Sequence, residues 1–139
     1  MNASGSLVLS CAAMALLTAM VAVRMLLARV AEMKARRIHP QAVATSRQAA
    51  EQYHQVQAAD NYRNLFEMPV LFYLLCALLV ALNKADSLFA AGAWAYVLLR
   101  CVHSYIHTGY NKVMHRFAAF LASSVVLAFL WVRLALQSL

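Results

Sequence analysis

The chain has 139 residues, of which 64% are hydrophobic and only 12% are charged. A soluble domain of this length carries about twice that charged fraction, so the composition excludes an ordinary soluble protein. The net charge of +7 could suggest a nucleic-acid partner, but the basic residues gather in two connections between apolar segments, and no nucleic-acid partner is expected. We expect one integral membrane domain over residues 1–139, with the lipid bilayer as its surroundings.

The first apolar segment runs from about Leu7 to Val30. No Lys or Arg precedes Arg24, so the segment lacks the basic region of a cleaved signal peptide and is expected to stay in the protein. The sequence Ile38-His39-Pro40 predicts the end of this helix, because proline cannot continue the backbone hydrogen-bonding pattern.

The second segment is predicted to be one long helix that starts at Ser46 and ends near Leu82. Thr45 and Gln48 have the spacing of a capping box, which supports a helix start at this point. No Gly or Pro follows until Pro69, which is predicted to kink the helix within the membrane.

The third segment runs from about Ser87 past Arg100, and the fourth runs from about Val113 to Leu136. The connections are too short for crossovers, so consecutive helices should be antiparallel. Open sheet edges are not viable in lipid, which argues against strands. The sequence therefore predicts an all-α integral membrane protein, built as an up-down bundle of four transmembrane helices.

The distribution of basic residues predicts the orientation in the membrane. Cytoplasmic connections carry an excess of Lys and Arg. The first and third connections are the basic ones, whereas the second, residues 83–86, is neutral. We therefore expect a multi-pass protein, in the inner or plasma membrane if bacterial, with both termini on the non-cytoplasmic side. The basic residues of the two connections are Lys34, Arg36, Arg37, Arg47, Lys112 and Arg116.

Polar residues of three helices fall at similar heights in the predicted bundle. At about 1.5 Å per residue, five of them lie about 21–28 Å from the non-cytoplasmic helix ends. They form a layer near the cytoplasmic edge of the membrane core, and an ionisable group at that depth suggests a functional site. The five residues are Asn64, Glu67, Arg100, His103 and Arg116.

Buried charges are normally paired, so Glu67 is predicted to pair with Arg100. Arg116 then has no carboxylate at its level, which suits an anionic ligand that enters from the cytoplasm. Two alternatives remain open. The layer could serve only to register the helices against one another. Arg116 could also reach the lipid phosphates through its long side chain.

His103 and His107 lie four residues apart on one helix face, where two imidazoles can chelate a metal. No Cys or carboxylate is placed to complete a site, so neither a metal nor a haem is expected. The three cysteines, Cys11, Cys76 and Cys101, stand singly in apolar runs and are interpreted as small buried hydrophobic residues.

Three short patterns together resemble the MAPEG family, the membrane-associated proteins in eicosanoid and glutathione metabolism. They are Asn64-x-x-Glu67, Arg100-x-x-His103 and the following Arg116. The phrase over residues 61–72, NYRNLFEMPVLF, is similar to the bacterial branch of that family. The resemblance implies a homotrimer that holds glutathione between neighbouring subunits near the cytoplasmic side.

The resemblance also implies roles for single residues. Asn64, Glu67, Arg100 and His103 match positions that hold glutathione. Arg116 matches the catalytic arginine, which favours the reactive thiolate by lowering the pKa of the glutathione thiol.

Two positions depart from the family's eukaryotic enzymes. Asp60 stands where those enzymes have Arg, and His107 stands where they have Tyr. Both replaced groups help to hold glutathione in the family. Arg63 and Lys112 are the candidates to compensate for these replacements, and we include them with His107 among the candidate binding residues.

The expected function is that of a membrane-bound, glutathione-dependent transferase or peroxidase acting on lipophilic electrophiles or hydroperoxides. The alternative is a non-enzymatic protein of the same fold that binds another anionic or lipid ligand. A small transporter is disfavoured, because its binding site would lie near the midplane of the bilayer.

Overall fold

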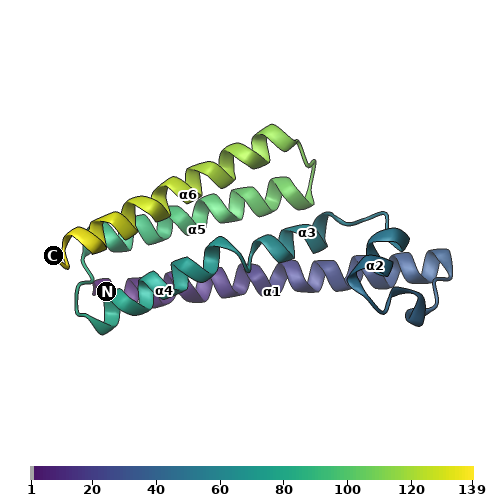
Figure 1. Cartoon of the computed structure of the whole chain (residues 1–139), viewed down its shortest axis with the longest axis horizontal. Coiled ribbons are helices and arrows are strands. Elements are labelled where there is room, and N and C mark those ends of the chain that lie inside the picture. The colour runs from purple at the N-terminus through teal and green to yellow at the C-terminus, as the bar shows by residue number, and fades with distance from the viewer. Residues whose placement is uncertain (1) are drawn as a thin grey trace.

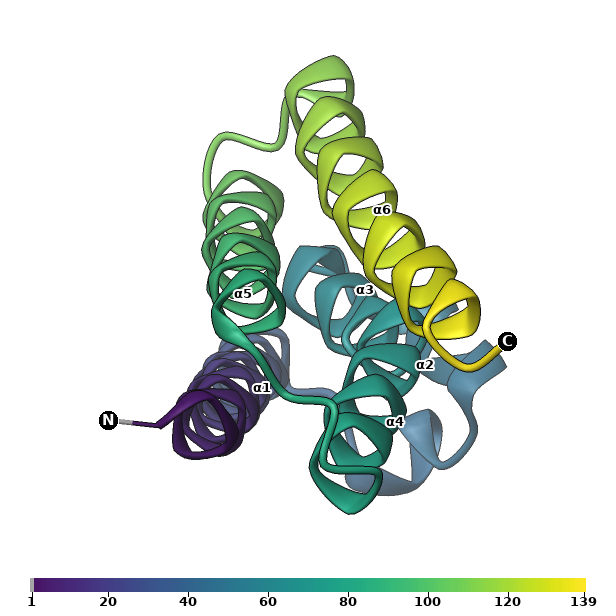
Figure 2. The ribbon, with the colours of Figure 1, turned by 90° about the vertical axis from the view of Figure 1, so that its left-hand side faces the viewer.

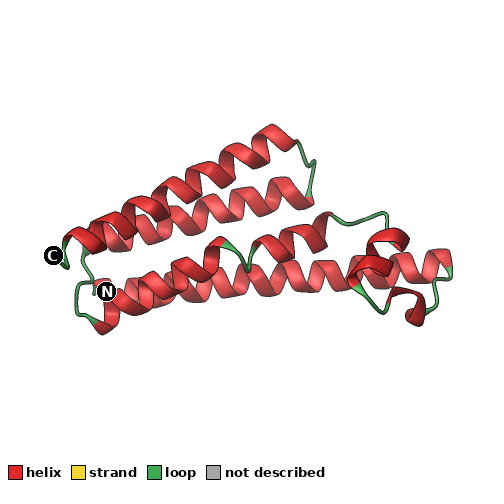
Figure 3. Cartoon of the chain, viewed as in Figure 1, coloured by secondary structure: helices red, strands yellow, loops and turns green. Residues whose placement is uncertain are grey.

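The computed structural model describes residues 2–139, and within that range all regular structure is helical (Figures 1 and 3). This confirms the prediction of an all-α protein. The elements in chain order are α1 (Ala3–Arg36), η1 (Pro40–Val43), α2 (Ser46–Gln52), α3 (Gln57–Asn64), α4 (Met68–Ala81), α5 (Ser87–Thr108) and α6 (Val113–Leu136).

Four long helical stretches run up and down side by side. Figure 1 shows α1 along the whole length of the molecule, with α3 and α4 following it in line and the α5–α6 hairpin beside them. Both termini and the α4–α5 connection lie at one end, here called the terminal end. The segment that connects α1 to α3 lies at the opposite end, here called the connection end. The α5–α6 turn faces the same way but stops level with α3. The end-on view in Figure 2 shows α1, α4, α5 and α6 grouped around a common interior.

The interior is apolar over most of its length. Met14 of α1, Phe72 of α4, Tyr96 of α5 and Leu130 of α6 are among its most buried side chains. The rings of Phe72 and Tyr96 stack with centroids 4.7 Å apart, which joins α4 to α5. Large apolar side chains also cover much of the outer surface, as expected for a protein surrounded by lipid.

Three helical stretches are long and apolar enough to cross a membrane: α1, residues Gln57–Ala81 (α3 with α4) and α6. With 22 residues, α5 is long enough as well, but Arg100, His103 and His107 make it more polar. These three side chains are buried inside the protein. The structure therefore describes a multi-pass membrane protein, and a fourth span through α5 stays a prediction.

The predicted ends of the first helix agree with the structure only in part. The helix ends at Arg36, just before the Ile38-His39-Pro40 sequence that predicted its end. It is longer than the predicted apolar segment, because it starts at Ala3 and passes Val30 by more than a turn. Since these additional turns at the connection end carry charged residues, hydrophobicity alone did not reveal them.

The prediction of one continuous helix from Ser46 to Leu82 is wrong. The capping box of Thr45 and Gln48 is confirmed, but α2 ends at Gln52 after seven residues. Tyr53 then adopts an extended backbone and buries its ring, over which the guanidinium of Arg29 lies 5.7 Å from the centroid. This tertiary contact with α1 outweighs the helix propensity of the Ala- and Gln-rich sequence.

A second interruption separates α3 from α4 at residues 65–67. Pro69 occupies the first turn of α4, where its missing N–H is tolerated, and it cannot donate to the carbonyl four residues earlier. The predicted kink at Pro69 is therefore present, but it is a full break. Glu67 leaves the helical conformation, with φ −92° and ψ −95°, and its side chain is exposed.

The terminal end is closed by polar contacts between α5 and α6. Asp86 caps α5 by accepting a hydrogen bond from the Phe89 N–H at 2.9 Å. The same carboxylate receives two bonds from Arg133 near the end of α6, at 2.9 Å and 2.5 Å. Further along α5, Gly92 leaves room for the side chain of Leu130 of α6. A Cβ added at residue 92 would lie only 2.6 Å from that side chain. The two helices are therefore held closely together at this end.

The Asp86–Arg133 pair predicts an acid-dependent loss of stability. Hydrogen bonds from Arg133 lower the pKa of Asp86 to about 2, below its ordinary value of about 3.9. Because the folded-state pKa is lowered, the pair stabilises the protein fully above about pH 4. This stabilisation is lost as the pH falls towards 2.

The test is thermal unfolding in detergent between pH 6 and pH 2, with wild-type protein and Asp86→Asn. Asparagine keeps the ability to cap α5 but loses the charge. We expect the stability advantage of wild type over the variant to shrink by at least half between pH 5 and pH 2. Parallel curves would show that the Asp86 carboxylate does not contribute.

Candidate functional site

A cavity of about 390 Å³ opens at the connection end, between α3 on one side and the α5–α6 hairpin on the other. Its volume falls within the range of about 300–1,000 Å³ that is usual for small-molecule sites. Polar side chains form one part of the wall and apolar side chains of α6 form another. The lining residues are Asp60, Arg63, Asn64, Glu67, His103, His107, Val113, Arg116, Phe117 and Phe120.

Most of the candidate binding residues predicted from the sequence meet in this cavity. Arg100 does not line it, because its side chain is fully buried behind Asn64. Lys112 also lies outside it, exposed at the N-cap of α6. The predicted residues that the structure brings together here are Arg63, Asn64, Glu67, His103, His107 and Arg116.

The predicted ion pair between Glu67 and Arg100 is wrong, because Asn64 lies between them. Nη2 of Arg100 donates to the Asn64 side-chain oxygen at 2.5 Å and to its backbone oxygen at 3.1 Å. The Asn64 amide in turn donates to Glu67 Oε2 at 3.1 Å. The break at residues 65–67 turns Glu67 outward, whereas the Asn64 side chain reaches the buried guanidinium.

Arg116 projects into the cavity from the first turn of α6. Its Nη1 donates to the Asn111 side-chain oxygen at 2.9 Å. Asn111 adopts a left-handed backbone conformation, with φ 49°, in the turn between α5 and α6. Within residues 2–139 no carboxylate lies close enough to form an ion pair with Arg116. Its positive charge is therefore available to a ligand.

Two imidazole rings of α5 present unpartnered nitrogens. His103 Nδ1 lies 3.1 Å from the backbone oxygen of Arg116. A carbonyl oxygen can only accept, so Nδ1 carries a proton, and in the neutral ring Nε2 is then an acceptor. In the described part of the chain, this buried Nε2 and the buried Nδ1 of His107 have no hydrogen-bond partner. Buried polar atoms are normally satisfied, so both nitrogens call for a ligand or water.

Asp60 and Arg63 form the exposed edge of the cavity. Their charged atoms are 3.8 Å apart, and the side chains are 50% and 60% exposed. Such a loose surface pair is worth little and leaves both groups able to contact a ligand. Arg63 therefore lies where it can act as a binding residue, whereas Lys112 does not.

Sequence reasoning missed the apolar wall of the cavity. Val113, Phe117 and Phe120 line it from α6. A helical spacing of three and four residues places them on the same face as Arg116. That spacing was visible in the sequence, but an apolar face is also what any membrane helix shows to lipid.

His103 and His107 do not form part of a metal site in the described residues, because no third ligand joins them. No group of three His, Cys, Asp or Glu side chains is close enough together there to hold a metal ion. The two rings meet edge to face with centroids 5.5 Å apart.

The apolar helices define a multi-pass membrane protein, with a cavity lined partly by polar side chains near one end. The chain belongs to the MAPEG family, whose family model matches residues 7–136. Comparison with curated proteins and with solved structures finds no match in either set. The resemblance seen in the sequence is thus confirmed at the level of the family, which acts in glutathione and eicosanoid metabolism. The bacterial branch stays a prediction.

Proposed function

We propose that the protein is a glutathione-dependent transferase or peroxidase that acts on lipophilic electrophiles or hydroperoxides. The observation that carries the proposal is the cavity at the connection end. It combines Arg116, which has no carboxylate partner in the described chain, with an apolar wall and the imidazole rings of His103 and His107. Family membership supports glutathione as the thiol.

The chemistry of the cavity suits glutathione. This tripeptide carries two carboxylates, one ammonium and one thiol. Arg63 and Arg116 are the cations that would hold its anionic groups, and Asp60 and Glu67 are the anions that would hold its ammonium. The cavity volume of about 390 Å³ is adequate for a ligand of this size.

Arg116 would supply the main chemical contribution. A guanidinium close to a thiol stabilises the thiolate, which is the reactive nucleophile. In a transferase reaction the sulfur forms a bond to an electrophilic carbon, while a leaving group departs or a proton is added elsewhere. In a peroxidase reaction two glutathione molecules are oxidised to the disulfide, and the hydroperoxide is reduced to an alcohol and water. Phe117 and Phe120 offer an apolar surface for either co-substrate.

The proposal includes the assembly and orientation of the protein. We propose a homotrimer of four-span subunits with the connection end in the cytoplasm and both termini on the other side. The family supports the trimer, and the excess of basic residues at the connection end supports the orientation.

A non-enzymatic binding protein of the same fold is the second candidate. The observation in its favour is the presence of Asp60 and His107 in the cavity, where a ligand other than glutathione would meet a carboxylate and an imidazole. This protein would bind its anionic or lipid ligand without activating a thiol.

Calorimetric titration of detergent-purified protein tests the proposal. Reduced glutathione should bind, whereas glutamate should not, because it lacks the thiol and most of the peptide. Oxidised glutathione should bind at least tenfold more weakly, because its second tripeptide does not fit the cavity. Absence of binding to folded protein would exclude glutathione as the ligand. Binding without conjugation of a lipophilic electrophile would favour the second candidate.

A further inference from the structure

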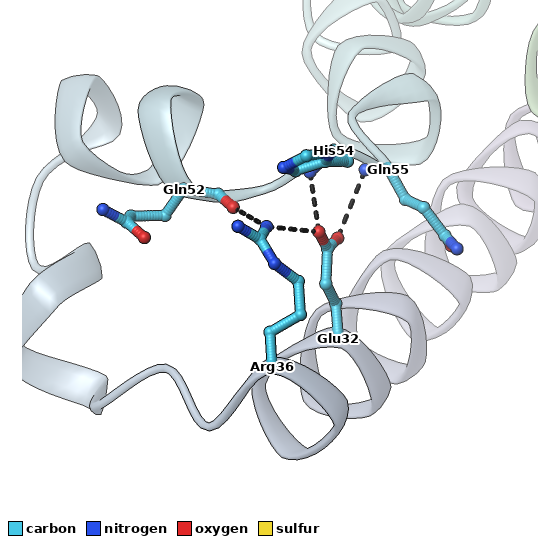
Figure 4. Close-up of polar contacts among 5 residues, drawn as sticks. All are labelled: Glu32, Arg36, Gln52, His54 and Gln55. Carbon is cyan, nitrogen blue, oxygen red and sulfur yellow. Dashed lines mark hydrogen bonds and ion pairs between the residues drawn. The ribbon is translucent and has the colours of Figure 1, made fainter.

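Glu32 near the end of α1 holds the backbone that leads into α3. Its carboxylate accepts hydrogen bonds from the His54 N–H at 2.7 Å and from the Gln55 N–H at 3.2 Å (Figure 4). The Glu32 side chain is only 8% exposed. These two bonds join residues more than twenty positions apart in the sequence, so they fix the position of the linker against α1.

Arg36 and Tyr53 complete this contact. Arg36 donates to Glu32 at 3.0 Å and also to the backbone oxygen of Gln52, as Figure 4 shows. Tyr53 is buried beneath the guanidinium of Arg29. The four residues between α2 and α3 are thus held by side chains from the last turns of α1.

The linker determines where α3 begins. Val56, the residue before α3, provides no side-chain cap, so the helix start has no local anchor of its own. From this start, α3 carries Asp60, Arg63 and Asn64 into the cavity wall. Across the bundle, Ser104 of α5 donates a long hydrogen bond of 3.3 Å to Asn61 in the middle of α3, and Arg100 bonds to Asn64 at the far end of α3. Neither contact holds the start of the helix.

We propose that Glu32 is a positioning residue, which sets the α3 wall of the cavity by anchoring the two backbone N–H groups that precede α3. This proposal rests on the proposed function only where it concerns glutathione. Glu32 lies outside the cavity, so its effect on ligand binding passes through the linker and α3.

A carboxylate suits this task because both of its oxygens accept hydrogen bonds. Glutamine has nearly the same shape but only one accepting oxygen. In Glu32→Gln the amide nitrogen would face one of the two backbone N–H groups, which leaves that N–H without a partner. The substitution therefore weakens the anchor with little change in volume.

Hydrogen exchange of the backbone amides, measured by mass spectrometry on detergent-purified protein, tests the anchor directly. In Glu32→Gln we expect exchange over residues 53–64 to become at least tenfold faster, with exchange in α4 and α6 unchanged. The matched control is Glu51→Gln. Glu51 also pairs with an arginine four residues away, at 3.3 Å, but it is exposed and does not touch the linker. The control should leave exchange over residues 53–64 as in wild type.

Glutathione kinetics provide the functional readout. We expect the KM for glutathione to rise about tenfold in Glu32→Gln, with kcat at saturating glutathione within twofold of wild type. Glu32→Asp, which keeps two accepting oxygens on a shorter side chain, should give smaller changes in both measurements and replaces Glu32→Gln if that variant does not fold.

The outcomes separate the two proposals. Unchanged exchange over residues 53–64 would overturn the anchor, and equally faster exchange throughout the bundle would show a general structural role instead. Faster local exchange with an unchanged KM would remove the link to the cavity. If wild-type protein binds no glutathione, the proposed function fails while the exchange measurement still decides the role of Glu32.

Discussion

Replacement of Arg116 by alanine should abolish formation of the glutathione thiolate. Wild-type protein mixed with glutathione should show thiolate absorbance near neutral pH, where free glutathione has almost none because a thiol titrates near pH 8.5. Arg116 is the cation of the cavity wall that has no carboxylate partner in the described chain, so its removal should eliminate the absorbance. Conjugation of a lipophilic electrophile should fall by about 100-fold or more, as when one electrostatic stabiliser is removed from an active site.

Two further variants make the test specific. Arg116→Lys keeps the positive charge but loses the planar guanidinium, so it should retain part of the absorbance and part of the activity. Lys112→Ala removes a cation four residues earlier in the chain that does not line the cavity, and it should behave as wild type. Full activity in Arg116→Ala would exclude Arg116 from the chemistry.

Asn64→Leu should be among the most destabilising single substitutions in the protein. Arg100 is fully buried, and the Asn64 side chain is the nearest acceptor for its guanidinium, at 2.5 Å. Of the acceptors that residues 2–139 offer this guanidinium, leucine would leave the backbone oxygen of residue 64 alone. The expected loss is about 3 kcal/mol in the free energy of unfolding, the scale for a buried charge that loses its partner.

Glu67→Gln provides the contrast for this prediction. Glu67 is exposed and contacts Arg100 only through Asn64, so its neutralisation should cost less than about 1 kcal/mol. Unfolding in detergent without ligand would measure both variants. Equal losses in the two variants would instead indicate a direct interaction between Glu67 and Arg100.

The sequence predicted the helical class and the approximate positions of the membrane helices, because these depend on local composition. The end of α1 before Pro40 and the capping box at Thr45 were predicted for the same reason. The break at Tyr53 was not predicted, because it depends on the contacts of that residue and its neighbours with α1, which are distant in the sequence. Ala- and Gln-rich sequence favours a helix only when no tertiary contact competes with it.

The candidate site was predicted better than its internal contacts. Counting residues along antiparallel helices was sufficient to bring Asn64, His103 and Arg116 to one level, since helix rise is nearly constant. The partner of Arg100 depends on how the backbone turns between α3 and α4. A count that treats this segment as one straight helix places Glu67 opposite Arg100, whereas the break gives that position to Asn64.

The break between α3 and α4 also explains how the protein accommodates Arg100 without a carboxylate. A helix that ends leaves its last carbonyl groups without partners and has a partial negative charge at that end. Asn64 is the last residue of α3, and its backbone oxygen accepts from Arg100. This oxygen also accepts a long bond of 3.4 Å from the Glu67 N–H, so the end of the interrupted helix contributes a partial negative charge beside the buried guanidinium. A continuous helix, such as Pro69→Ala would favour, would use this oxygen within its own backbone, so we expect the substitution of the proline to weaken the hydrogen bonding of Arg100.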